Sequence, residues 1–391
     1  MVEGQTMEVK EINEKLSFDE LNLKDDLLRG IFSYGFENPS KIQSSSIPSI
    51  VEGKDIIAQA QSGTGKTGSF VIGSLQKINQ KLKASQILII SPTHELVRQT
   101  SEVVQEISKY MDISSMEVMG GTNIEECKRK LNRSPQIIIG TPGRVLDMIH
   151  RKHLFTDNIH TLIFDEADEI LSYGFKETIY NIIQFISSKT QICLFSATMP
   201  PEILELSESF MRNPEKILVN KEQLTLEGII QYYVSLRQSD WKYDVLKDLY
   251  DTINISQCII YINSRNRLME VYHSLIRDEF PVGCIHGELN SNERKDVMEK
   301  FKSGHTRILL STDLLSRGID IQQLSLVINY DLPKSKETYI HRIGRSGRYG
   351  RKGVAINLIT DRELQYMKEI ETFYETQIKE LPQNISEILS A

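Results

Sequence analysis

A glycine-rich segment that ends in lysine and threonine is the part of this sequence best suited to phosphate chemistry. Residues 60–67 read Ala-Gln-Ser-Gly-Thr-Gly-Lys-Thr, follow the apolar run 56–58 and open a helical stretch. A strand, a glycine-rich turn and a helix in this order are typical of a P-loop, whose backbone N–H groups and helix N-terminus bind nucleotide phosphates. We expect Lys66 to reach the β- and γ-phosphates and the Thr67 hydroxyl to coordinate Mg²⁺. The phosphate cradle is predicted from Ser62, Gly63, Thr64, Gly65, Lys66 and Thr67.

Two acidic residues directly after another apolar run fit the same chemistry. Asp165 and Glu166 follow residues 161–164, and an acidic group at the carboxyl end of a buried parallel strand points into the crevice where such sheets bind ligands. Asp165 could hold Mg²⁺ through water, while Glu166 could orient and deprotonate an attacking water. A solvated acidic helix start is the plainer alternative, but the P-loop upstream favours the catalytic interpretation.

A pair of hydroxyl residues marks the end of a further run. Ser196 and Thr198 follow residues 192–195. Two hydroxyls at a strand terminus suit either a polar contact in the same site or a plain helix N-cap, and the sequence alone leaves both open.

Short buried strands must position all of these groups, and short apolar runs recur along the chain. Consecutive β-branched residues are typical of parallel strands buried on both faces. The segments between the runs are long enough for crossover helices, such as 67–81 and 293–302. Strands that alternate with helices predict an α/β fold with mostly parallel sheets. The runs lie at 56–58, 87–90, 137–139, 162–164 and 192–195 in the first half, and at 259–262, 308–310 and 326–328 in the second.

The length of 391 residues and one gap in this pattern indicate two domains. Residues 221–229 are mostly polar, contain Gly228 and lack an apolar run, so we place the linker there. The predicted boundaries are an N-terminal extension at 1–16, a first domain at 17–220 that carries the P-loop, the linker at 221–229, and a second domain at 230–391.

Composition limits the classes of protein and partner. The 40% hydrophobic and 25% charged residues are ordinary for a soluble globular protein, and no apolar run is long enough to span a bilayer. The polar start of the chain lacks the apolar core of a secretory signal. The four cysteines have neither C-x-x-C nor zinc spacing, so we expect buried, reduced thiols in the cytoplasm or nucleus. The net charge of −7 argues against binding nucleic acid by bulk positive charge, so any such site must be a local groove.

The chemical segments taken together resemble a known family. An alanine-initial P-loop, Asp-Glu-Ala-Asp at 165–168 and Ser-Ala-Thr at 196–198, in this order, are similar to the motifs of the DEAD-box RNA helicases. The resemblance covers nearly the whole chain, from Phe18 to Leu389. It implies two RecA-like domains of the P-loop NTPase type, each a mostly parallel sheet flanked by helices, with ATP and Mg²⁺ as cofactors and RNA as the partner.

The resemblance assigns further residues to the nucleotide. Residues 35–43 look like the adenine-binding motif, with Phe36 stacked on the base and the Gln43 amide bonded to its edge, because an amide offers donor and acceptor together. Arg345 and Arg348 resemble arginine fingers, and their spacing predicts that they lie on one side of a helix; a basic helix face is the plain alternative. The implied catalytic residues are Glu166, Lys66, Asp165, Arg345 and Arg348, the implied ribose contacts are Gly318 and Asp320, and the residues expected to couple the two domains are Ser196, Thr198, Asp168 and His341.

The implied RNA contacts are mainly small residues and helix starts, which bind phosphates without base preference. Three residues depart from the family pattern: His94 stands where arginine is usual, Glu288 where aspartate is usual, and Ser291 where glutamine is usual. Trp241 is expected in the core rather than stacked on a base. The implied RNA-binding residues are Pro92, Thr93, Gly120, Gly121, Thr141, Pro142, Gly143, Arg144, Asn263, Arg265, Arg294, Thr312 and Asp313.

The sequence therefore predicts an RNA-stimulated ATPase that unwinds short RNA duplexes. Residues 196–200 and 312–315 look more like family members that act in translation initiation near the mRNA 5′ region, whereas Ser346 and Tyr349 look more like members found in exon junction complexes. The alternative is an ATP-locked RNA clamp of exon-junction or ribosome-biogenesis type; an NTPase acting on proteins or small molecules is a third. Expected partners are single-stranded RNA or mRNA and a scaffold protein of the initiation-factor 4G type. We expect a monomer, no membrane contact and a cytoplasmic location, with the nucleus as the alternative.

Overall fold

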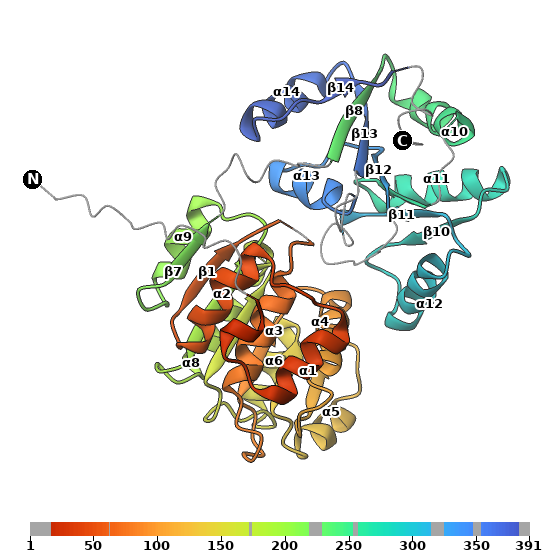
Figure 1. Cartoon of the computed structure of the whole chain (residues 1–391). Helices are drawn as coiled ribbons and strands as arrows, with labels where there is room; N and C mark the ends of the chain where they lie inside the picture. Colours follow the sequence, from red (N-terminus) through yellow and green to blue (C-terminus); the bar gives the residue numbers. More distant parts are fainter. Residues whose placement is uncertain are drawn as a thin grey trace, which may run out of the picture. The chain divides into compact units, whose positions relative to one another are not determined.

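The computed structural model divides the chain into two compact units, Met1–Val219 and Asn220–Ala391 (Figure 1). The structure describes residues 17–61, 63–171, 174–218, 229–252, 257–313, 324–346 and 353–382. The predicted N-terminal extension and all of the predicted linker except Ile229 lie outside these ranges. Because strand β8 begins at Ile229, the last residue placed in the linker belongs to the second sheet. The domain boundaries otherwise remain predictions.

The first unit is built on a sheet of seven parallel strands in the order β3-β4-β2-β5-β6-β1-β7. Its central strands are apolar runs whose side chains are buried on both faces. Along β1, for example, Ile56 and Ala58 belong to one hydrophobic core and Ile57 to the core on the opposite face. The bounds are β1 (Ile56–Gln59), β2 (Ile87–Ile90), β3 (Ser115–Val118), β4 (Ile137–Gly140), β5 (Thr161–Asp165), β6 (Gln191–Ser196) and β7 (Glu215–Leu218).

Helices cover both faces of this sheet (Figure 1). Apolar residues of α1 to α4 join one core and those of α5 to α9 join the other. Both faces are therefore shielded from water, as a parallel sheet requires. The bounds are η1 (Asp19–Leu21), α1 (Asp25–Tyr34), α2 (Lys41–Val51), α3 (Lys66–Lys77), α4 (His94–Ile107), α5 (Ile124–Leu131), α6 (Pro142–His150), α7 (Ala167–Ile170), α8 (Lys176–Gln184) and α9 (Pro201–Glu208).

The contact between α1 and α4 has no room for a side chain at Gly30. A Cβ at this position would lie 1.8 Å from the carbonyl oxygen of Ile107. We expect Gly30→Ala to force the helices apart and lower the free energy of unfolding by about 1–3 kcal/mol. Gly143→Ala in α6 is the matched control, because nothing lies within 4 Å of its Cβ, and it should be neutral or slightly stabilising. Urea unfolding compares the two; equal stability of Gly30→Ala and the parent protein would contradict this packing.

The second unit repeats the architecture with seven parallel strands in the order β10-β11-β9-β12-β13-β8-β14. Its strands are β8 (Ile229–Leu236), β9 (Cys258–Tyr261), β10 (Val282–Ile285), β11 (Ile308–Ser311), β12 (Leu326–Asn329), β13 (Gly353–Thr360) and β14 (Lys379–Glu380). Its helices are η3 (Ser239–Trp241), α10 (Lys242–Thr252), α11 (Arg265–Arg277), α12 (Ser291–Lys302), α13 (Lys336–Ile343) and α14 (Leu364–Phe373).

The predicted α/β fold is confirmed, and each predicted apolar run lies in a strand to within one residue. The two predicted helices also form, as α3 and α12, although α3 ends at Lys77 rather than at residue 81. Six strands were not predicted: β3, β7, β8, β10, β13 and β14. Most of these carry polar residues between apolar ones, such as Ser-Met-Glu-Val in β3, or lie at a sheet edge.

The side chain of Trp241 is 47% exposed, so the expectation that it belongs to the core is wrong. It lies in the short η3 helix before α10, where the chain turns at the surface. Of the four free cysteines, Cys127, Cys193 and Cys258 are buried and Cys284 is partly so, which agrees with the burial expected for these thiols. Within the described ranges, no helix has the length and apolar character needed to cross a membrane.

Candidate nucleotide and RNA sites

The predicted P-loop connects β1 to α3. Gly63 and Gly65 have φ angles of 83° and 103°, a left-handed backbone that glycine adopts without strain. Lys66 begins α3 and is buried, and its Nζ donates a 2.8 Å hydrogen bond to the carbonyl oxygen of Ala60. The amine therefore lies over its own loop, where phosphates would bind. Ser62 lies outside the described residues.

The predicted adenine-binding residues lie against the start of α3. The Nε2 of Gln43 donates to the carbonyl oxygen of Gly65 at 3.3 Å, and its Oε1 accepts from the N–H of Ser40 at 2.9 Å. The ring of Phe36 stacks on Phe18 with centroids 6.3 Å apart. The structure thus brings an aromatic ring and an amide to the P-loop, which sequence spacing alone could not establish.

Gly68 is the point of closest approach between α3 and these two residues. A Cβ there would lie 2.6 Å from Nε2 of Gln43 and 2.9 Å from the ring of Phe36. We expect Gly68→Ala to displace both side chains and weaken ATP binding about tenfold. Gly174→Ala, with nothing within 4 Å of its Cβ, should leave the affinity unchanged. Titration with a fluorescent ATP analogue measures both; parental affinity in Gly68→Ala would show that Phe36 and Gln43 do not contact the base.

Two carboxylates lie at the carboxyl end of β5. Asp165, the last residue of the strand, is 3% exposed. Burial raises the pKa of its carboxyl to about 7, with a further contribution from the Glu166 carboxylate, while Lys66 of the P-loop opposes the rise. The N–H of Glu166 donates to Oδ1 of Asp165 at 3.1 Å, and Glu166 has a φ of 52°. Such a backbone is costly for a non-glycine residue and is typical of functional positions.

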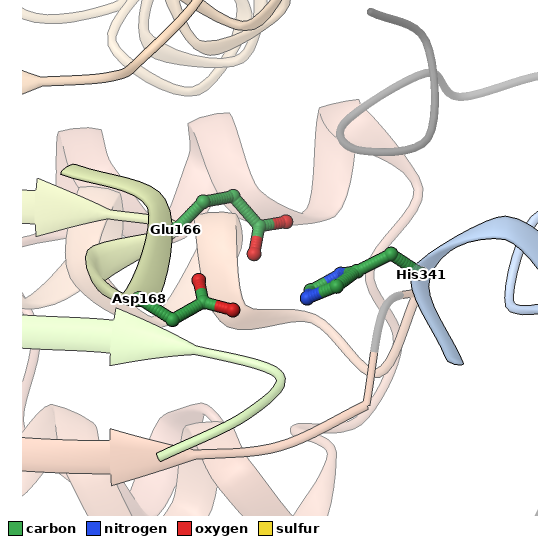
Figure 2. Close-up of side chains that lie close together, drawn as sticks. All are labelled: Glu166, Asp168 and His341. Carbon is green, nitrogen blue, oxygen red and sulfur yellow. The ribbon is translucent and has the colours of Figure 1, made fainter. Parts of the chain in front are cut away.

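The turn after β5, which carries Glu166 and Asp168, is hydrogen-bonded to the Ser-Ala-Thr segment at the end of the neighbouring strand β6. The Thr198 hydroxyl donates a 2.5 Å hydrogen bond to Oδ2 of Asp168, and the N–H of Thr198 donates to Oγ of Ser196 at 3.4 Å. Helix α9 begins at Pro201 without a side-chain cap, so neither hydroxyl is a simple N-cap. Figure 2 shows Glu166 and Asp168 on the turn after β5; His341, also labelled there, belongs to α13 of the second unit.

The predicted RNA contacts of the first unit lie at the carboxyl ends of β2, β3 and β4, which are neighbours in the sheet. Thr93 caps α4 by accepting the N–H of Leu96. Arg144 Nη1 donates to the carbonyl oxygen and the hydroxyl of Thr122, at 3.0 and 3.1 Å. Thr122 thus joins the loop after β3 to α6, a contact that the sequence did not predict. The members that meet at this edge are Pro92, Thr93, Gly120, Gly121, Thr141, Pro142, Gly143 and Arg144.

In the second unit, two of the predicted contacts, Arg265 at the start of α11 and Arg294 in α12, both bind the loop between β10 and α12. Arg265 forms an exposed 2.8 Å ion pair with Glu288, one of the departures from the family pattern. Arg294 Nη2 donates to the carbonyl oxygen of Gly287 at 2.7 Å. The side chain of Ser291 lies outside the described residues.

The arginine-rich segment departs from its predicted geometry. Helix α13 ends at Ile343, and Arg345 follows it in a turn, with its Nε donating to the carbonyl oxygen of His341 at 3.1 Å. The prediction that Arg345 and Arg348 lie on one side of a helix is therefore wrong for Arg345, because the helix ends too early. Arg348, Gly318 and Asp320 lie outside the described residues.

Comparison with known proteins supports the same assignment. Residues 40–206 match the model of the DEAD/DEAH box helicase family, and residues 241–350 match the helicase conserved C-terminal domain. The chain is 54% identical over 372 residues to ATP-dependent RNA helicase eIF4A of Kluyveromyces lactis, covering 95% of this chain and 94% of that one. The chain belongs to the DEAD-box helicases. The resemblance found in the sequence is thereby confirmed.

Further relatives bear out this DEAD-box helicase assignment over nearly the whole chain. The eIF4A helicase of Coccidioides immitis is 51% identical over 373 residues, covering 95% of this chain and 94% of the relative. The solved structure of Saccharomyces cerevisiae Dbp5 bound to RNA and ADP BeF3 matches with a TM-score of 0.90 and 33% identity, covering 96% of this chain and 98% of that one. The two sheets are the two RecA-like domains of this family.

Proposed function

We propose that this chain is an RNA-stimulated ATPase that couples ATP hydrolysis to the local opening of short RNA duplexes, and that it acts in translation initiation. The observation that carries the catalytic part is the meeting of the P-loop lysine with the buried Asp165 and its neighbour Glu166 in one site. The relatives that are named eIF4A and match over nearly the full chain support a role in initiation. RNA binding by the related Dbp5 supports RNA as the partner.

The first domain supplies a site that fits Mg²⁺ and the triphosphate. Asp165 is a buried carboxyl group with a raised pKa, and a second carboxylate lies beside it. A divalent cation would bind favourably here, because it offsets the free-energy cost of burying the negative charge of Asp165. Thr67 and Asp165 would hold Mg²⁺, the latter through water. Bound Mg²⁺ would neutralise charge on the transferred phosphoryl group.

Each protein group then has a definite task. Lys66 binds the β- and γ-phosphates, and Glu166 orients the attacking water and accepts its proton. Phe36 and Gln43 hold the adenine, while Gly318 and Asp320 contact the ribose. Arg345 and Arg348 of the second domain stabilise charge on the γ-phosphate, and Ser196, Thr198, Asp168 and His341 couple the nucleotide to the RNA-bound state.

The proposed partners follow from the family and the relatives. The chain binds single-stranded RNA through phosphate and sugar contacts, with little base preference. We propose a monomer in the cytoplasm that is recruited by a scaffold protein of the initiation-factor 4G type.

Strand release from a short RNA duplex tests unwinding against the alternative of an ATP-locked clamp. The expected result is rapid release with ATP and little multiple-turnover release with a non-hydrolysable analogue, because enzyme recycling requires hydrolysis. Tight RNA binding with the analogue, but no strand release under any nucleotide, would support the clamp and contradict the helicase proposal.

A further inference from the structure

A continuous chain of hydrogen bonds runs beneath α13 across the second sheet. Arg342 of α13 donates from Nη1 to Oδ1 of Asn329 at 3.2 Å, and Asn329 donates from Nδ2 to Oδ1 of Asn357 at 2.9 Å. The Nδ2 of Asn357 donates to the Tyr339 hydroxyl at 3.2 Å, and this hydroxyl donates to Oε1 of Gln231 at 2.9 Å. All five side chains are buried. The proposed mechanism gives none of them a task.

The bonds in this chain all point the same way. Each amide accepts through its oxygen and donates through its nitrogen, so that one bond polarises the next. Burial raises the pKa of the Tyr339 phenol, so this group keeps its proton and donates it. At the far end, Nε2 of Gln231 donates to the Thr376 hydroxyl at 2.8 Å, in the segment between α14 and β14. The chain therefore ties α13 to three adjacent strands, β12, β13 and β8.

This polar chain interrupts an apolar face of the sheet. Asn357 lies between Ala355 and Ile359 on β13, and these two residues pack with apolar residues of α13. Because side chains alternate along a strand, Asn357 faces α13 as well, and Asn329 is its register partner on β12. Apolar side chains of the same shape at both positions would be about as stable. Hydrophobic contacts have no direction, whereas hydrogen bonds do, so the polar chain fixes where α13 sits on the sheet.

The position of α13 matters because Arg345 follows it closely. The helix ends at Ile343, and Nε of Arg345 donates to the carbonyl oxygen of His341 within the helix. A shift of α13 therefore carries Arg345 with it. A misplacement of about 1 Å, caused by a change far from the chemistry, can lower a rate about 100-fold.

We propose that Asn329, Asn357 and Tyr339 are positioning residues that set the place of Arg345 for ATP hydrolysis. Each is buried and acts only through α13. The inference rests on the proposed function, because it takes Arg345 as a group that stabilises charge on the γ-phosphate. It explains why amides occupy two positions at which apolar residues would serve folding equally well.

The test measures RNA-stimulated ATP turnover by the full-length protein with leucine at both amide positions. Leucine has the same number of side-chain heavy atoms as asparagine, and the double variant Asn329→Leu/Asn357→Leu removes both partners of the central bond, so it should fold with little loss of stability. We expect kcat at saturating RNA to fall about 10- to 100-fold. The affinity for a fluorescent ATP analogue should stay within about twofold of the parent value, because the first domain is unchanged.

Tyr339→Phe is the second variant, and it takes the place of the leucine variant if that protein does not fold. It removes only the hydroxyl that joins Asn357 to Gln231. We expect kcat to fall about fivefold, the value of one net hydrogen bond, again with ATP affinity unchanged.

The same substitutions in an Arg345→Ala background separate positioning from general damage. Arg345→Ala removes the group that the polar chain is proposed to position, so the leucine substitutions, or Tyr339→Phe in their place, should lower kcat no further. General damage to the second domain would instead lower kcat by the same factor in both backgrounds.

Gln257→Ala is the matched structural control. Gln257 is buried just before β9, at the opposite edge of the sheet from the end of β12, and its amide donates to the carbonyl oxygens of Phe301 and Thr306. This variant should unfold at lower urea concentration than the parent protein and keep the parental kcat.

The outcomes separate this inference from the proposed function. Parental turnover by Arg345→Ala would remove Arg345 from the proposed mechanism, and the inference would fall with it. Loss of turnover in Arg345→Ala, together with parental kcat in the leucine variant or its replacement, would overturn the inference alone. An equal loss of kcat in the parent and Arg345→Ala backgrounds would also overturn the inference alone.

Discussion

Replacing Glu166 by glutamine is expected to lower RNA-stimulated ATP turnover about 100- to 10,000-fold, the range that a general base contributes. Glutamine has nearly the same shape and can still orient a water, but it cannot accept the proton. The P-loop contacts are unchanged, so the affinity for ATP should stay within about twofold of the parent value. Phosphate release at saturating single-stranded RNA measures turnover, and a fluorescent ATP analogue measures binding.

Glu177→Gln is the control for this experiment, because Glu177 is an exposed carboxylate in the first turn of α8. It should turn over ATP as the parent does. Substantial turnover by Glu166→Gln would show that another group accepts the proton and would remove Glu166 from the catalytic role.

Asp165→Asn is expected to abolish turnover while making the metal-free protein more stable at alkaline pH. The ordinary pKa of an aspartate is 3.8, and burial raises that of Asp165 to about 7. Between these values the folded protein keeps a proton that the unfolded chain has lost. The parent therefore loses stability as the pH rises through this window, and the loss is complete above about pH 7. Asparagine carries no charge at any pH, so the Asp165→Asn variant does not lose stability in this way.

The gain in the free energy of unfolding of Asp165→Asn over the parent protein should be near zero at pH 4. At pH 8 it should be on the order of 2–4 kcal/mol, since one pKa unit corresponds to about 1.4 kcal/mol. Urea unfolding in the presence of a chelator measures it. Asp55→Asn is the matched control, because Asp55 is also buried in the first domain but accepts the N–H groups of Ile192 and Arg212 and pairs with the Arg212 side chain. That variant should be destabilised. A destabilised Asp165→Asn at pH 8 would contradict the raised pKa.

The parts that the sequence predicted well depend on local patterns. Consecutive isoleucines located the central strands, and the order of strand, glycines and lysine located the P-loop, because both signals lie within a few neighbouring residues. Edge strands such as β3 and β14 carry weaker apolar patterns and were missed. Helix ends were also less certain, which is why Arg345 was expected on a helix that in fact ends at Ile343.

The parts that could not be predicted depend on contacts between distant segments. The hydrogen bond from Gln43 to Gly65 joins helix α2 to the P-loop residue just before α3, and no local pattern encodes it. The bonds from Arg342 to Asn263 and Asp313 likewise cross from α13 to the ends of β9 and β11. Trp241 was expected in the core rather than stacked on a base, but it lies in the short surface helix η3, where its side chain is exposed.

ATP turnover by the pure full-length protein, with and without single-stranded RNA, tests the central claim most directly. The account predicts slow turnover alone and a several-fold increase with RNA, lost in Glu166→Gln. Turnover that is as fast without RNA as with it, or that survives in Glu166→Gln, would contradict an RNA-coupled ATPase built on this site.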